Sequence, residues 1–246
     1  MNGVALLARD IYVPLTGRHH IAYAGHHNIA WELSEHPEFF PSRGTLAGLV
    51  KELRLAGHAS ACISAEDLEF VYNRPDRIRL LETAIRSAGY EPRIIVYLRP
   101  QAQYCVSLYA EYAKFGTIMP FSDYVDHVVR TGTFGDAPHE TQFDYELLLE
   151  NFAAVFGDER IIVRPYISAG DSNALLQEFL DLITPPDHGV GISLATPERL
   201  NVSPAQPREV ALNETQLARL VARFGPGNAA VARRFGIAVP VVDRPL

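Results

Sequence analysis

The chain has 246 residues, of which 48% are hydrophobic and 21% are charged, and these proportions are those of an ordinary globular protein. Its length predicts a single α/β domain that covers residues 1–246. The net charge of −7, from 22 basic and 29 acidic residues, argues against non-specific binding to nucleic acid or to an anionic membrane surface.

Predicted strands and helices alternate along the chain. Short runs of β-branched and aromatic residues predict strands over 11–14, 58–64, 94–98 and 160–166. Apolar residues at helical spacing predict helices over 3–9, 46–56, 65–72, 76–88, 101–115, 121–130, 144–156, 171–183, 215–224 and 228–235. Residues 184–207 are rich in Pro, Gly and Ser, which predicts a loop within the domain. Because strands alternate with helices, we expect a parallel sheet with helices on both faces.

The cysteines and the termini indicate the cellular compartment. Cys62 and Cys105 both lie in apolar segments, and neither has a partner at metal-ligand spacing, so we expect reduced structural thiols. No apolar run reaches the length of a membrane span, and the first residues lack the pattern of a signal peptide. These features predict a cytoplasmic protein.

The segment from 93 to 109 carries the most specific chemical signal. Arg99 directly follows the predicted strand, at the carboxyl end where open α/β sheets bind their ligands. Pro100 suits the first turn of the next helix, and this helix carries Ser107 two turns beyond the arginine. A guanidinium and a hydroxyl so placed could converge on one phosphate. The alternative is an arginine ion-paired at the strand end and a serine that faces solvent.

Several short motifs follow one another between residues 11 and 235: Ile63-Ser-Ala-Glu66, Tyr97-Leu-Arg-Pro100 with Ser107-Leu-Tyr109, Phe143-Asp-Tyr145 with Phe156-Gly157, Ile161-Ile-Val-Arg-Pro-Tyr166, Phe179-Leu180, Asn201-Val-Ser203, and Asn228 before a short predicted helix. Their order resembles the sulfotransferases that use 3′-phosphoadenosine 5′-phosphosulfate (PAPS), in the bacterial branch related to carbohydrate sulfotransferases. The resemblance implies a three-layer fold like that of P-loop NTPases, with a parallel sheet flanked by helices. It also implies that Arg99 and Ser107 hold the 3′-phosphate of PAPS. The family reaction transfers a sulfuryl group from PAPS to a hydroxyl, and the expected acceptor is a carbohydrate.

The N-terminus departs from the family pattern. The family opens with a strand, a Lys- and Gly/Thr-containing loop and a helix, and that loop wraps the 5′-phosphosulfate with backbone N–H groups. No lysine precedes Lys51 in this chain, and the local candidate Ser42-Arg-Gly-Thr45 follows no strand, so we interpret it as the N-terminal turn of a helix. We therefore expect the first strand, loop and helix to be missing and sulfuryl transfer to be impaired. Another segment or a partner chain would fill the place of the missing strand.

Two residues are candidates for the group that takes a proton from an acceptor hydroxyl. Glu66 follows a predicted strand end, although a glutamate in the first turn of a helix also stabilises the helix dipole. His27 is the preferred histidine because an apolar helical stretch begins behind it at Asn28. It belongs to a loop that resembles the substrate-side histidine region of the family and that also holds His19, His20 and His26. No carboxylate or cysteine stands at the usual ligand spacing from these histidines, so no metal is expected.

Three interpretations stay open. In the first, the start of the gene is misassigned or truncated, so that Met1 is an internal residue. In the second, the chain is a catalytically inactive family member that binds a nucleotide or a glycan. The third is an unrelated α/β enzyme for nucleotides or phosphate esters, which the lack of a Walker-type loop or an Asp-rich metal motif disfavours. The acceptor, the oligomeric state and the docking of the tail over 239–246 are left open by the sequence.

Overall fold

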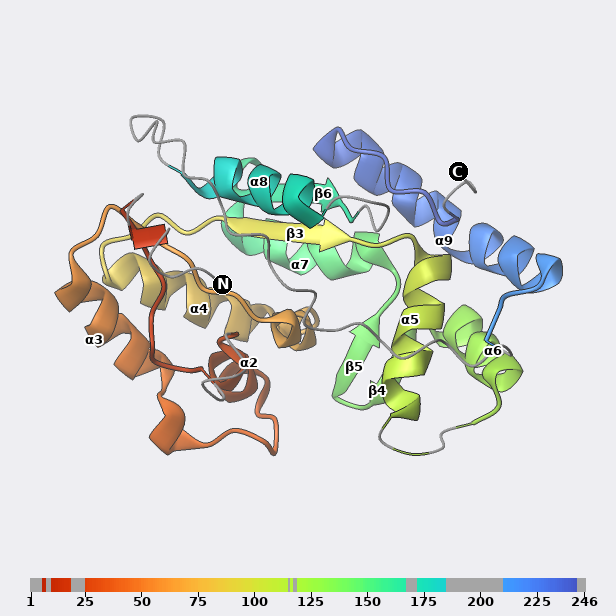
Figure 1. The fold of residues 1–246 in the computed structure, drawn as a ribbon, viewed down its shortest axis with the longest axis horizontal. Coiled ribbons are helices and arrows are strands. Elements are labelled where there is room, and N and C mark those ends of the chain that lie inside the picture. The colour runs from red at the N-terminus through yellow and green to blue at the C-terminus, as the bar shows by residue number, and fades with distance from the viewer. Residues whose placement is uncertain are drawn as a thin grey trace. The chain divides into compact units, whose positions relative to one another are not determined.

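A computed structural model of the chain describes residues 6–7, 10–18, 25–114, 116, 119–166, 172–184 and 210–242. Helices and short strands alternate along it, which confirms the α/β class (Figure 1). The chain divides into two compact units: unit 1 is Met1–Pro92 with Ser168–Asn201, and unit 2 is Arg93–Ile167 with Val202–Leu246. Each unit is thus assembled from two separate stretches of sequence. The single domain that the length predicts stays a prediction.

Unit 1 is mainly helical. Its elements are β1 (Ile11–Tyr12), α2 (His27–Ser34), η1 (Pro41–Arg43), α3 (Leu46–Ala56), β2 (Ser60–Ala61), η2 (Glu66–Val71), α4 (Pro75–Ser87) and α8 (Ser172–Ile183), where η denotes a 3₁₀ helix. Strands β1 and β2 pair in parallel, with Ile11 opposite Ser60. Helix α8 packs on this pair, because Leu180 forms a buried cluster with Leu6, Ile11 and Cys62.

Unit 2 contains the longest strands. Its elements are β3 (Ile94–Leu98), α5 (Gln101–Ala113), α6 (Phe121–Thr131), β4 (Thr133–Asp136), β5 (His139–Gln142), α7 (Tyr145–Phe156), η3 (Asp158–Arg160), β6 (Ile161–Pro165) and α9 (Glu214–Phe235). Strands β3 and β6 pair in parallel, with Ile94 opposite Ile161, and β4 and β5 form an antiparallel hairpin. The core beside them is rich in aromatic residues and contains Ala102, Cys105, Tyr124, Val125, Val128, Phe134, Phe143, Leu220, Phe224 and Val241.

Local sequence signals explain the boundaries of α3. The Gly48 N–H donates to the Thr45 side chain at 3.1 Å, which satisfies one of the free N–H groups at the start of the helix. The helix ends at Gly57, whose φ of 64° is left-handed and suits glycine. Residues 41–43 form the separate 3₁₀ helix η1, and α3 begins only at Leu46, so of residues 42–45, interpreted as the N-terminal turn of a helix, only Thr45 belongs to the start of α3, as its cap.

Several predicted elements differ in extent. The expected larger parallel sheet is replaced, among the described residues, by two separate parallel pairs, and the strand predicted over 58–64 is reduced to Ser60–Ala61. The helix predicted over 65–72 is the 3₁₀ helix η2. The prediction missed the hairpin β4–β5, which is largely polar in sequence and buries Phe134 against the ring of Tyr112 at a centroid distance of 5.0 Å.

The C-terminal region forms one helix where two are predicted. Pro226 lies inside α9, between Gly225 and Gly227, and this Gly-Pro-Gly sequence predicts a break. The helix continues because its buried residues keep helical spacing across the proline: Leu220, Phe224, Asn228 and Val231. Asn228 therefore lies in the middle of a helix and not before one, which corrects the prediction.

The residues after α9 dock within unit 2. Val239 and Val241 are buried, and the Val241 carbonyl accepts a hydrogen bond from the Ala102 N–H at 2.9 Å. This bond satisfies a free N–H group in the first turn of α5. Tyr109 and Tyr112 of α5 pack against the core of unit 2. Phe115, the loop over 185–207 and most of the predicted helix over 3–9 lie outside the described residues.

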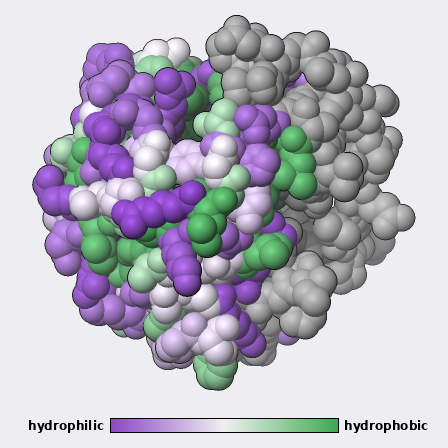
Figure 2. Space-filling view, turned by 90° about the vertical axis from the view of Figure 1, so that its left-hand side faces the viewer, coloured by the Kyte–Doolittle hydropathy of each residue, from purple (hydrophilic) through white to green (hydrophobic). Residues whose placement is uncertain are grey.

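Apolar and polar side chains are mixed on the surface. Figure 2 shows apolar residues among hydrophilic ones on one face of the molecule. The described apolar side chains that are more than half exposed are Leu15, Phe40 and Leu55. Scattered exposed apolar residues are normal in soluble domains and indicate no particular partner.

Candidate functional site

Arg99 lies at the carboxyl end of β3, as the sequence predicts. The neighbouring strand continues beside it, because the Tyr166 N–H donates to the Leu98 carbonyl at 2.8 Å. The central carbon of the Arg99 guanidinium lies 4.4 Å from the centroid of the Tyr166 ring, which is a cation–π contact. Among the described residues, Arg99 has no carboxylate partner. The ion-paired alternative is therefore not found within this part of the chain.

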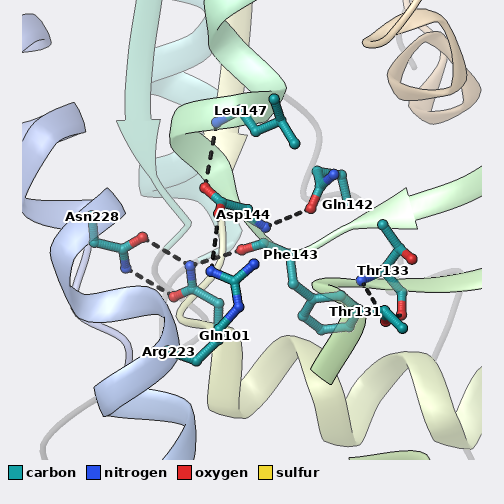
Figure 3. Close-up of polar contacts among 9 residues, drawn as sticks. All are labelled: Gln101, Thr131, Thr133, Gln142, Phe143, Asp144, Leu147, Arg223 and Asn228. Atoms are coloured by element: carbon teal, nitrogen blue, oxygen red, sulfur yellow. Dashed lines mark hydrogen bonds and ion pairs between the residues drawn. The ribbon is translucent and has the colours of Figure 1, made fainter. Parts of the chain in front are cut away.

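A buried pair of amides fixes the turn that carries Arg99 (Figure 3). The Gln101 side chain is fully buried, and its Nε2 donates to Asn228 Oδ1 at 2.8 Å and to the Phe143 carbonyl at 3.1 Å. In return, Asn228 Nδ2 donates to Gln101 Oε1 at 2.8 Å and to the Val239 carbonyl at 2.8 Å. The Tyr145 hydroxyl also donates to the Arg99 carbonyl. Residues from three other segments of the chain thus hold the β3–α5 turn in place.

A second group of polar contacts ties α7 to α9 near this turn (Figure 3). Asp144 caps α7 by accepting from the Leu147 N–H, and its Oδ2 lies 3.2 Å from Nη1 of Arg223 on α9. The Asp144 N–H donates to Gln142 Oε1 at 2.8 Å. Because these groups satisfy one another, the network in Figure 3 is a structural support for the strand end. Asn228, a motif residue in the sequence, belongs to this support.

Ser107 lies on α5, in the element that directly follows Arg99. Its side chain is half-buried, and its hydroxyl makes no hydrogen bond with any described residue. Arg99 and Ser107 therefore share unit 2 and occupy consecutive elements, although no hydrogen bond joins their side chains. Both polar groups keep their hydrogen-bonding capacity within the described part of the chain.

His27 begins α2 and pairs with a carboxylate in unit 1. Its Nδ1 lies 2.8 Å from Asp67 Oδ2 on η2, and the two side chains are only 19% and 17% exposed. The hydrogen bond to Asp67 raises the pKa of His27 above its usual value, and this effect outweighs the opposing effect of burial. The sequence prediction missed Asp67, although the residue stands next to Glu66. A signal was available: the carboxylates at 66 and 67 both follow the strand predicted to end at 64.

Glu66 is the first residue of η2 and is exposed to solvent. It makes no hydrogen bond with a described residue, but its charge also acts to raise the pKa of His27. The structure thus brings His27, Glu66 and Asp67 together in unit 1. Arg99 and Ser107 lie in unit 2.

His26 has a structural environment that differs from that of its neighbour. It is fully buried, its Nδ1 accepts from the Ser64 N–H at 3.1 Å, and its Nε2 lies 3.0 Å from the Pro14 carbonyl. Burial lowers the pKa of His26, so the ring is neutral at pH 7. These bonds hold the start of α2 against residue 64 and so place His27 beside η2. His19 and His20 lie outside the described residues.

No group of three or more His, Cys, Asp and Glu side chains in the described part of the chain is arranged to hold a metal ion. Within the same residues, no helix combines the length and the apolar character that crossing a membrane requires. Comparison of the chain with family models, curated proteins and solved structures identifies no match.

Proposed function

We propose that this chain is a sulfotransferase-like protein that binds PAPS, or the product 3′,5′-adenosine bisphosphate, with Arg99 and Ser107 on the 3′-phosphate. The observation that carries the proposal is the guanidinium at the carboxyl end of β3, without a carboxylate partner in the described chain and stacked on Tyr166. A buried amide pair fixes the turn beneath it. A guanidinium held in this way offers a planar fork of donors that matches a phosphate.

The proposal includes a three-layer fold like that of P-loop NTPases, with a parallel sheet flanked by helices. The parallel pairing of β3 with β6, with helix α5 directly after β3 and helix α7 before β6 in the same unit, supports it. Parallel sheets normally have more strands than the described pair and are covered on both faces, so the proposal includes a further strand, from another segment or from a partner chain, beside this pair.

The proposed reaction is sulfuryl transfer from PAPS to a hydroxyl, with a carbohydrate as acceptor, in the cytoplasm and without a metal. We expect the reaction to be impaired, because it depends on stabilisation of charge on the transferred group, the family loop supplies a lysine for this, and no lysine precedes Lys51 in this sequence. His27 is the candidate proton acceptor, supported by its contact with Asp67. If the impairment is complete, the chain is a binding protein for the nucleotide or for a glycan.

Calorimetric titration with 3′,5′-adenosine bisphosphate tests the binding site. Arg99→Ala should weaken binding by about ten- to a hundredfold, since it removes charge-assisted hydrogen bonds of about 1.5–3 kcal/mol. Ser107→Ala should weaken it by about two- to tenfold. Arg93→Ala is the matched control, because it removes the same charge at the opposite end of the same strand, and its affinity should equal that of the wild type.

A second ligand separates recognition of the 3′-phosphate from recognition of the nucleoside. Adenosine 5′-monophosphate lacks the 3′-phosphate, so the wild type should bind it more weakly than the bisphosphate, and Arg99→Ala should reduce that difference. Absence of wild-type binding, or equal affinity in Arg99→Ala, contradicts the site. A sulfate-transfer assay with PAPS and saccharide acceptors then distinguishes an enzyme from a binding protein.

A further inference from the structure

We propose that Asp67 is the positioning residue of His27: it holds Nδ1–H and leaves Nε2 of the neutral ring as the acceptor for a proton from a substrate hydroxyl. The inference rests on the proposed function for its hydroxyl substrate. It assigns a role to a residue that the sequence motifs do not include. Both residues that it assigns, Asp67 and His27, lie in unit 1.

The geometry of the pair fixes the tautomer of His27. An ionised carboxylate only accepts hydrogen bonds, so the 2.8 Å contact with Asp67 Oδ2 requires the proton on Nδ1. In the neutral ring the lone pair is then on Nε2, and no described residue donates to that atom. Because both partners are mostly buried, few other side-chain arrangements are open to them.

Gly25 lies close against the Nε2 edge of the ring. A Cβ atom at position 25 would lie 2.5 Å from Nε2 and 2.7 Å from Cδ2 of His27, which no real contact allows. Only glycine therefore fits beside the ring in this position. On another side, the Trp31 ring lies 5.9 Å from the imidazole, between centroids, one helical turn along α2.

The carboxylates near His27 both raise its pKa. From η2, Asp67 and Glu66 both favour the protonated ring. His26, its neighbour in sequence, is buried and neutral, and is bonded to residues 14 and 64. From α4, Arg74 and Arg77 pair with Glu35, at the opposite end of α2. His27 is thus made a stronger base by two carboxylates, and both act from η2.

The proton transfer is balanced. The substrate O–H bond breaks and its proton goes to Nε2, while the oxygen forms its bond to the sulfuryl sulfur and the bond from sulfur to the nucleotide phosphate breaks. The imidazolium that results is stabilised by the Asp67 carboxylate, and it returns its proton to solvent. A sulfate ester and 3′,5′-adenosine bisphosphate are the products.

Nitrogen-15 NMR of the full chain tests the tautomer directly, with His27 assigned by His27→Gln. The neutral wild-type ring should be protonated on Nδ1, and its pKa should lie above that of an ordinary histidine. Asp67→Asn should lower the pKa of His27, Asp67→Ala should also move the proton to Nε2, and Asp67→Glu should restore the wild-type tautomer. The matched control, Glu66→Gln, removes the adjacent charge and should leave the tautomer unchanged.

A pH profile of the transfer rate adds a functional measurement. His27 acts as a base only when neutral, so the transfer rate should rise with pH through the pKa of His27. Asp67→Asn should shift this rise to lower pH and reduce the maximal rate at high pH by about tenfold or more. The inference is overturned if the neutral wild-type His27 ring is protonated on Nε2, or if the pKa of His27 is the same in Asp67→Asn as in the wild type. The first of these measurements is made on the wild type and does not depend on the folding of a variant. If the wild type transfers no sulfuryl group, the proposed transfer reaction fails, while the titration still decides the role of Asp67.

Discussion

At the scale of single residues, a side chain's partners distinguish structural support from a candidate site. His26 and His27 are adjacent, yet burial lowers the pKa of the first and Asp67 raises that of the second. Gln101 and Arg99 show the same contrast. The Gln101 side-chain amide forms hydrogen bonds with other described residues, whereas the Arg99 guanidinium has only an aromatic contact among the described residues. Candidate sites in this protein are therefore the polar residues that their neighbours hold in place but whose hydrogen-bonding groups are not all used within the described chain.

Glu52 is the clearest residue with a structural role. Its carboxylate accepts from the Tyr12 hydroxyl at 2.7 Å and from the Leu15 and Thr16 N–H groups at 2.7 and 2.8 Å. Burial acts to raise the pKa of Glu52, but these hydrogen bonds together outweigh it and lower the pKa. A carboxyl with a lowered pKa contributes stability above its unfolded-state pKa and loses that contribution as the pH falls through its folded-state pKa.

We predict that Glu52→Gln lowers the free energy of unfolding at pH 7 by about 1–2 kcal/mol, because it removes charge-assisted bonds. The difference from the wild type should shrink as the pH falls from the unfolded-state pKa of Glu52 towards and through its lower folded-state pKa. Urea unfolding at pH 7 and at pH 3 measures both values. A difference that stays constant between the two pH values would contradict the role assigned to the ionised carboxylate.

At the scale of elements, α9 shows how packing overrides local sequence. The helix passes through Pro226 because its buried face continues on both sides. Its two glycines meet different surroundings: a Cβ at Gly225 would contact nothing within 4 Å, whereas a Cβ at Gly227 would lie 3.2 Å from Asp144 Oδ1. Only one of the two positions therefore has room for a side chain.

We predict that Gly225→Ala raises the free energy of unfolding by no more than about 0.5 kcal/mol, because the preference of alanine over glycine in a helix interior is partly offset by the steric conflict between its Cβ and the following Pro226. Gly227→Ala should gain less or lose stability, since Asp144 bonds Arg223 and caps α7 and would have to move. Urea midpoints of the two variants give the comparison. Equal gains at both positions would show that Asp144 moves without loss.

Elements specified by local signals could be predicted from the sequence, and elements specified by distant contacts could not. The amphipathic pattern and Thr45 predict α3 with its observed bounds, Leu46–Ala56. The β3 strand and the place of Arg99 were predicted from the apolar run and the Pro that follows. The continuity of α9 and the partner of His27 depend on residues far away in sequence, such as Asp67, and no local pattern contains that information.

At the scale of the whole molecule, neither unit is a continuous segment. Unit 1 requires α8, which follows the 93–167 stretch of unit 2 in sequence, and Leu180 of α8 completes its buried cluster. Each unit also contains one free buried cysteine, Cys62 in unit 1 and Cys105 in unit 2. Burial raises the pKa of these thiols to about 11 and about 12, so both are unreactive while folded.

The cysteines can therefore report the opening of each unit. Leu180→Ala should destabilise unit 1 by about 2–4 kcal/mol, because it leaves a cavity beside Cys62. Cys62 should then react with a thiol reagent about tenfold faster or more, with a smaller change at Cys105. The matched control is Leu55→Ala, a change at a side chain that is 77% exposed, which should alter neither rate. Equal acceleration at both cysteines would indicate that the units open together.

The hydrogen bond from Ala102 to Val241 has a consequence for the order of events on the ribosome. The first turn of α5 lacks this partner, and the unit 2 core lacks Val241, until the residues after α9 have been synthesised. Unit 1 needs nothing later than α8 for its buried cluster, so it can close while α9 is still being made. Nascent chains should therefore have a folded unit 1 while the β3–α5 turn is still open, and the Arg99 site should be the last part of the protein to mature.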